Sequence, residues 1–113
     1  RVLATPASTG SLPTSGNQED FVSMGMTSAL KLEQSVGLAR TIIAIELLSA
    51  ARALDMREDS SAAPLLQEAV RRLREHVPGW TKDCVLSVPI KQAEKFIAAG
   101  LLNGIELPTD VAA

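Results

Sequence analysis

The chain has 113 residues, 46% of them apolar, and a formal net charge of −2 at pH 7. This length suffices for one domain at most, and the charge excludes the basic surface with which proteins bind nucleic acid. Its single cysteine, Cys84, excludes an internal disulfide and is typical of a reducing compartment, so we expect a cytoplasmic protein.

Residues 1–16 are rich in Ser, Thr, Pro and Gly, which predicts an extended loop. Pro13 and Gly16 predict a turn at its end. A polar cluster that includes two acids follows this turn: Asn17, Gln18, Glu19 and Asp20.

The polar cluster has two interpretations. Ser15 and Gln18 have the spacing of a capping box, which would place Glu19 and Asp20 in a first helical turn, where carboxylates are favoured. The cluster is larger than a cap requires, however, and it precedes a helix that we expect to be buried. Buried polar groups need partners, so the second interpretation is a site for a ligand or another chain.

Residues 17–56 are predicted to form one long helix, because apolar residues recur at helical spacing. From Thr41 to Leu54 the apolar residues cover every face, with charges only at Glu46 and Arg52. Interspersed charged and polar residues exclude a membrane span. Such a helix would be roughly 60 Å long, whereas a globule of this size is only about 30 Å across. We therefore expect other sequence or other subunits to cover it.

Two shorter helices are predicted after a polar connector. Ser61 is expected to cap the first, with Pro64 in its first turn, and this helix should end near His76. The turn at 78–80 should be anchored by burial of Trp80. The last helix should run from Pro89 to Gly100. The predicted fold is therefore all-α, with one long central helix and two shorter helices in residues 17–113.

Metal and phosphate sites are not indicated in these two helices. The only histidine, His76, has no Cys, His or acid at the spacing of metal ligands, so we interpret it as a helix-end residue. The three arginines of the first short helix are interpreted as a solvated face in preference to a phosphate-binding patch: Arg71, Arg72 and Arg74.

Several stretches of this chain resemble histidine ammonia-lyase, within the family of aromatic amino-acid ammonia-lyases. They are PAS at 6–8, LPTSGNQEDFVSMG at 12–25 and AIELL at 44–48. The resemblance is dense from residue 6 to 57 and looser to about residue 105. Enzymes of this family are several times longer, so the resemblance implies that this chain is a C-terminal part of such an enzyme.

The resemblance implies a helical-bundle homotetramer with the long helix at its centre. It also implies non-oxidative deamination of L-histidine to urocanate and ammonia. The family's electrophile, a methylideneimidazolone, forms from an Ala-Ser-Gly tripeptide that this chain lacks, and the family's catalytic tyrosine is also absent. Thr14-Ser15-Gly16 is similar to the tripeptide but is expected to be a turn. The isolated chain is therefore expected to be inactive.

Site residues follow from the same resemblance. The residue that matches Glu19 is Glu in histidine lyases and Gln in phenylalanine and tyrosine lyases, so Glu19 is the expected catalytic residue and favours an imidazole substrate. Asn17, Gln18 and Glu19 are the expected substrate-binding residues. Phe21 stands where histidine lyases usually have His, which leaves another aromatic amino-acid lyase or aminomutase as an alternative. A helical assembly module without chemistry is the other alternative.

Overall fold

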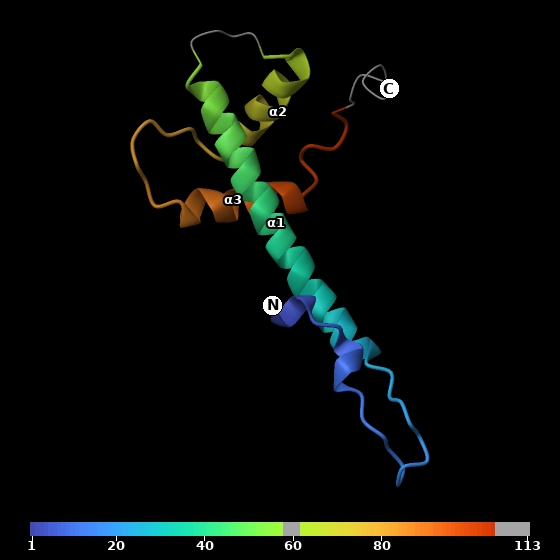
Figure 1. Ribbon diagram of the computed structural model, residues 1–113. Coiled ribbons are helices and arrows are strands. Elements are labelled where there is room, and N and C mark those ends of the chain that lie inside the picture. Colours follow the sequence, from blue (N-terminus) through green and yellow to red (C-terminus); the bar gives the residue numbers. More distant parts are fainter. Residues whose placement is uncertain (58–61, 106–113) are drawn as a thin grey trace. The chain divides into compact units, whose positions relative to one another are not determined.

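The computed structural model describes residues 1–57 and 62–105. In that part of the chain it contains three α-helices, α1 (Gly25–Asp55), α2 (Pro64–Arg74) and α3 (Ser87–Ala98), and no strand (Figure 1). Two short 3-10 helices precede them, η1 (Val2–Ala4) and η2 (Ala7–Gly10). The prediction of an all-α fold with one long and two shorter helices is confirmed.

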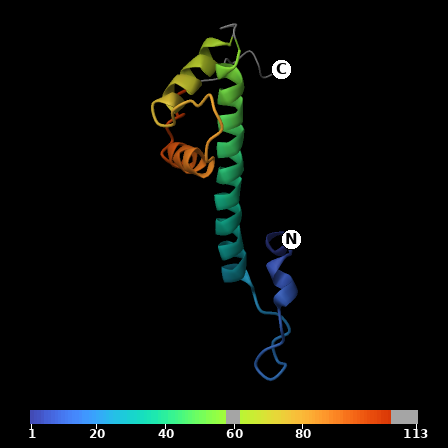
Figure 2. The ribbon, with the colours of Figure 1, turned by 90° about the vertical axis from the view of Figure 1, so that its left-hand side faces the viewer.

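The chain forms two compact units, Arg1–Ala39 and Arg40–Ala113. In the first unit, η1 and η2 lie beside the beginning of α1 (Figure 2), and the Lys31 ammonium donates a hydrogen bond to the Thr5 carbonyl oxygen. In the second unit, α2 and α3 both pack against the later part of α1 (Figure 2).

The hydrophobic core lies in the second unit. Its fully buried members come from all three helices and the segment after α2: Ala44, Leu48, Ala51, Leu73, Val77, Ala93 and Phe96. The α1 members are spaced four and three residues apart and therefore share one helix face. Other faces of the same helix remain uncovered, with Ile42 58% and Ile43 51% exposed. The described residues thus cover only one side of the apolar helix.

The beginning of α1 differs from the prediction. The helix starts at Gly25, not at Asn17. Asn17 has a left-handed backbone, which an α-helix does not contain, and the Glu19 and Val22 N–H groups bond to Thr14 and Ser11 and not within a helix. The first bond into the helix runs from the Ser28 N–H to the Met24 carbonyl. Residues 17–24 therefore belong to the preceding loop.

The shorter helices lie within two residues of their predicted bounds. α2 ends at Arg74 and not at His76, and Ser61, its predicted cap, lies outside the described residues. α3 starts at Ser87, so that Pro89 falls in the first turn, where its missing N–H costs nothing. Gly100 ends α3 with φ +67°. The Leu101 N–H then reaches the Phe96 carbonyl at 3.4 Å, as in a Schellman motif.

Trp80 anchors the segment after α2, as predicted. Its half-buried ring packs against the core, with the guanidinium carbons of Arg52 and Arg74 each 5.9 Å from the ring centroid. Arg74 also pairs with Asp55 at 2.6 Å, and Arg52 donates to the Trp80 carbonyl oxygen. These contacts join the end of α1 to the chain that leads into α3.

Candidate functional site

The polar cluster predicted as a site lies on a tight hairpin-like loop in the first unit, between η2 and α1 (Figure 1). Thr14 and Glu19 form an antiparallel bridge. The Thr14 N–H donates to the Glu19 carbonyl at 2.9 Å, and the Glu19 N–H donates to the Thr14 carbonyl at 3.3 Å. The four residues between them form the tip of the loop.

The tip reverses the chain through three consecutive left-handed residues. The φ angles are 52° at Ser15, 63° at Gly16 and 69° at Asn17. Glycine adopts this conformation without cost and asparagine tolerates it, whereas it is uncommon for serine. The Gln18 N–H closes the tip with a 3.3 Å bond to the Ser15 carbonyl.

A second pair of hydrogen bonds closes the base of the loop. The Val22 N–H donates to the Ser11 hydroxyl oxygen at 2.9 Å, and that hydroxyl donates to the Val22 carbonyl at 3.1 Å. The Ser11 side chain therefore forms the pair of hydrogen bonds that a neighbouring strand would form with its backbone. The two closures join the two arms of the loop at residues 11–22.

The structure brings all predicted site residues together on this loop. Asn17, Gln18 and Glu19 are exposed, as are Asp20 and Phe21. The Glu19 carboxylate accepts a hydrogen bond at its Oε2 atom from the Thr14 hydroxyl, at 2.9 Å. An acid and two amides are thus exposed at consecutive positions of the loop and can accept and donate hydrogen bonds.

The helix-cap interpretation of this cluster is wrong. Ser15 and Gln18 form no capping box, because the bond between them joins backbone groups at the loop tip. Glu19 and Asp20 lie before Gly25, where α1 begins, so neither stands in the first helical turn. The positive end of the helix dipole acts only within about one turn and does not account for these acids.

Two residues of the loop were not identified from the sequence, Thr14 and Ser11. The Thr14 hydroxyl bonds to Glu19, five residues later, and the Ser11 hydroxyl bonds to Val22, eleven residues later. The available signal was two hydroxyl residues that flank Leu12-Pro13, which is compatible with many loops. Thr14-Ser15-Gly16 is a turn, as predicted, with both backbone polar groups of Thr14 engaged by the bridge.

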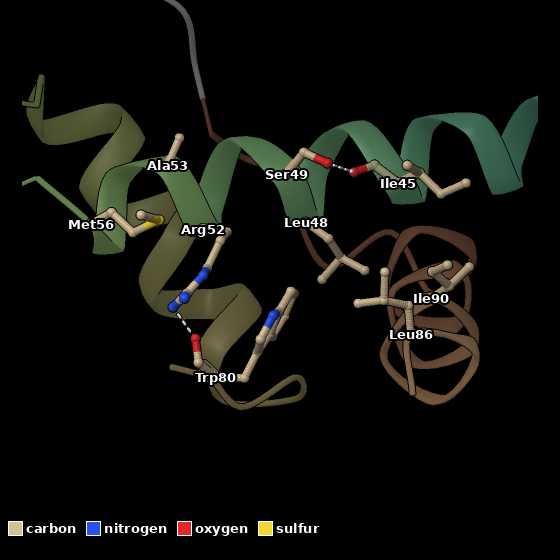
Figure 3. Close-up of a pocket in the computed structure, with 9 residues that line it drawn as sticks. All are labelled: Ile45, Leu48, Ser49, Arg52, Ala53, Met56, Trp80, Leu86 and Ile90. Carbon is tan, nitrogen blue, oxygen red and sulfur yellow. Dashed lines mark hydrogen bonds between the residues drawn. The ribbon is translucent and has the colours of Figure 1, made fainter. Parts of the chain in front are cut away.

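A groove of about 320 Å³ lies in the second unit, between α1, Trp80 and the beginning of α3 (Figure 3). Its walls are mostly apolar, and Ser49 and Arg52 supply the polar atoms. The Ser49 hydroxyl donates to the Ile45 carbonyl at 2.8 Å, while Arg52 turns toward the Trp80 carbonyl (Figure 3). With an arginine as its one titratable lining residue, this groove has no general acid or base.

The arginines of α2 are paired with acids, Arg71 and Arg72 with Glu68 of the same helix and Arg74 with Asp55 of α1. Arg71 and Arg72 each lie 2.7 Å from Glu68, and these hydrogen bonds lower the pKa of the Glu68 carboxyl to about 2. Arg71 also pairs with Glu75. These ion pairs offset the positive charge of the arginines, which does not favour a phosphate-binding patch. The prediction of a solvated face is confirmed for Arg71, whose side chain is 60% exposed, and is wrong for Arg74, whose side chain is 18% exposed.

Among residues 1–57 and 62–105, no three His, Cys, Asp or Glu side chains gather where a metal ion could bind. No helix of these residues combines the length and hydropathy that are needed to cross a membrane. His76 contacts the Phe96 ring at a centroid distance of 5.4 Å.

The proteins similar to this chain belong to one enzyme family. Residues 1–75 match the family described as aromatic amino acid lyase. Histidine ammonia-lyase of Koribacter versatilis is 46% identical over 90% of this chain, and that of Anaeromyxobacter sp. (strain K) is 47% identical over 95%. The chain spans about a fifth of the length of these curated relatives.

A solved structure supports the same relationship. The crystal structure of histidine ammonia-lyase from Trypanosoma cruzi matches 96% of this chain with a TM-score of 0.83 and 32% identity. The matched part is 22% of that protein's chain. From the family match and the identity to curated relatives, we conclude that this chain belongs to the aromatic amino acid lyase family.

Proposed function

We propose that this chain is the part of a histidine ammonia-lyase that supplies one wall of the active site and a helix of the subunit core. The reaction is the non-oxidative deamination of L-histidine to urocanate and ammonia. The observation that carries the proposal is 46–47% identity to histidine ammonia-lyases over at least nine-tenths of this chain. The loop of residues 11–22 supports it with an exposed carboxylate that accepts a hydrogen bond from Thr14.

The loop can bind and orient an amino-acid substrate. The Glu19 carboxylate can accept a hydrogen bond from an imidazole N–H or an ammonium group, and the amides of Asn17 and Gln18 can donate as well as accept. Because the Thr14 and Ser11 closures restrain the loop, they lower the conformational entropy that is lost on binding.

The methylideneimidazolone of this family would supply the electrophile. Neither its Ala-Ser-Gly precursor nor any tyrosine occurs in these 113 residues. The similar tripeptide at 14–16 is a bridged turn, which fits a structural role and not that of a precursor. The contribution proposed for this chain is therefore a carboxylate and two amides that face the substrate.

The substrate assignment can be tested with a full-length protein that contains this chain. We expect kcat/KM for L-histidine to exceed that for L-phenylalanine and L-tyrosine by about 10²-fold or more, because a site that hydrogen-bonds a ring N–H rejects rings without one. Urocanate absorbance and released ammonia measure the rates. A preference for L-phenylalanine or L-tyrosine would instead support another lyase of the family. Absence of turnover with all three would support an assembly module.

We also propose that α1 contributes to a homotetramer. The uncovered apolar residues of α1 that are at least half exposed support this: Met26, Leu30, Leu32, Val36, Leu38, Ile42 and Ile43. Exposed apolar surface on this scale is unusual for a monomer and marks an interaction surface.

The isolated chain is therefore expected to self-associate at micromolar concentration, as measured by sedimentation velocity. Replacing Ile42 by Lys should shift it toward the monomer, because a charge would be buried in the contact. Gln92→Lys, at an exposed polar position of α3 and outside the proposed contact helix, is the matched control and should leave the association unchanged. A monodisperse monomer of the unsubstituted chain would contradict the proposal.

A further inference from the structure

The Glu19 side chain is oriented by a contact that the backbone does not require. Thr14 and Glu19 exchange both backbone hydrogen bonds, so they stand directly opposite each other with their side chains on one face. This pairing fixes the Cα position of Glu19, but the side-chain torsions of an exposed glutamate remain free to rotate. The direction of the carboxylate must therefore be set by something else.

The Thr14 hydroxyl supplies that constraint. It donates to Glu19 Oε2 at 2.9 Å, and threonine is stiff at χ1 because it is β-branched. Thr9, in η2, instead donates to the Pro6 carbonyl at 2.8 Å. The Thr14 bond thus differs from that neighbouring hydroxyl bond, because its acceptor is a carboxylate and not the backbone.

In this geometry one oxygen of the Glu19 carboxylate accepts the Thr14 hydrogen bond. A carboxylate has two oxygens and about four lone-pair positions, so the bond to Oε2 leaves Oε1 to accept from a substrate. In water such an exposed bond contributes little, because water competes for both groups. In a closed site without bulk water the same bond is stronger and holds the carboxylate before the substrate arrives.

We propose that Thr14 is a positioning residue, which aims the Glu19 carboxylate at the substrate through the bond to Oε2. The inference rests on the proposed function of Glu19 and adds a specific donor to it. Thr14 acts through Glu19 and does not itself contact the substrate.

The test uses an active enzyme that contains this chain, with L-histidine as substrate. Thr14→Val keeps the shape and the β-branch but removes the hydroxyl, and kcat should fall about tenfold, the scale of one hydrogen bond to a charged group. Thr14→Ser restores the hydroxyl and should recover kcat to within about threefold. Thr9→Val removes a hydroxyl that bonds to the backbone and should leave kcat unchanged.

A double-mutant cycle separates positioning from a structural role. In a Glu19→Ala background, Thr14→Val should cause no further loss of kcat, because no carboxylate remains to be aimed. An equal loss in both backgrounds would overturn the inference, and so would full activity of Thr14→Val beside a slow Glu19→Ala enzyme. Full activity of Glu19→Ala itself would overturn the proposed function of Glu19. The two failures are thus distinguishable.

Discussion

Replacing Glu19 by Gln should lower kcat for L-histidine by about 10²-fold, the scale of one electrostatic or proton-transfer contribution to a transition state. The amide keeps the size of the side chain and can still accept from the Thr14 hydroxyl, so the substitution removes the charge and little else. The free energy of unfolding should barely change, because the bridge to Thr14 uses backbone atoms. Initial rates of urocanate formation and a thermal melt of the same active enzyme measure the two quantities.

Asp20 provides the matched control for Glu19. It is the adjacent carboxylate, it is exposed, and it lies just outside the bridge. Asp20→Asn should change kcat by less than about threefold if the effect belongs to a carboxylate aimed at the substrate. Equal losses in both variants would point to the summed negative charge of the loop. Full turnover of Glu19→Gln together with a lower melting temperature would make Glu19 a structural residue.

The helical fold could be predicted from the sequence because long apolar periodicity is a strong local signal. The face of α1 that forms the core could not be predicted. Every face from Thr41 to Leu54 is apolar, so periodicity alone does not distinguish buried Ala44 and Leu48 from exposed Ile42 and Ile43. That distinction depends on where α2 and α3 pack, which is a property of the folded chain.

The loop shows where local rules fail. Ser15 and Gln18 satisfy the spacing of a capping box, yet the loop is closed by contacts between residues five and eleven positions apart. A rule that looks three residues ahead cannot detect such contacts. The location of the polar cluster was predicted because the residue types and the resemblance fall on the same stretch, whereas its geometry depends on Thr14 and Ser11.

The contacts around Trp80 also join residues that lie far apart in the sequence. The turn and the burial of the ring could be predicted from Pro78-Gly79-Trp80. The partners could not, because Arg52 precedes Trp80 by 28 residues and Asp55 precedes Arg74 by 19. Pairings over such separations are determined by packing of helices and not by sequence neighbours.

The largest stability effect is expected from Phe96→Ala. Phe96 is 2% exposed and is the largest fully buried side chain of a small core. Its truncation removes apolar contacts and leaves a cavity, at a cost of about 3–5 kcal/mol. Small domains are stable by only about 5–15 kcal/mol, so most of the second unit's stability should be lost.

Denaturant titration followed by fluorescence of Trp80 measures this loss, because Trp80 is the only tryptophan and packs against the core. Phe21→Ala is the matched control, since it is the same substitution in the other phenylalanine, which is 64% exposed. That variant should change the free energy of unfolding by no more than about 0.5 kcal/mol. If both variants unfolded at the same denaturant concentration as the unsubstituted chain, α3 would not be packed on α1 through Phe96, and the core described here would be wrong.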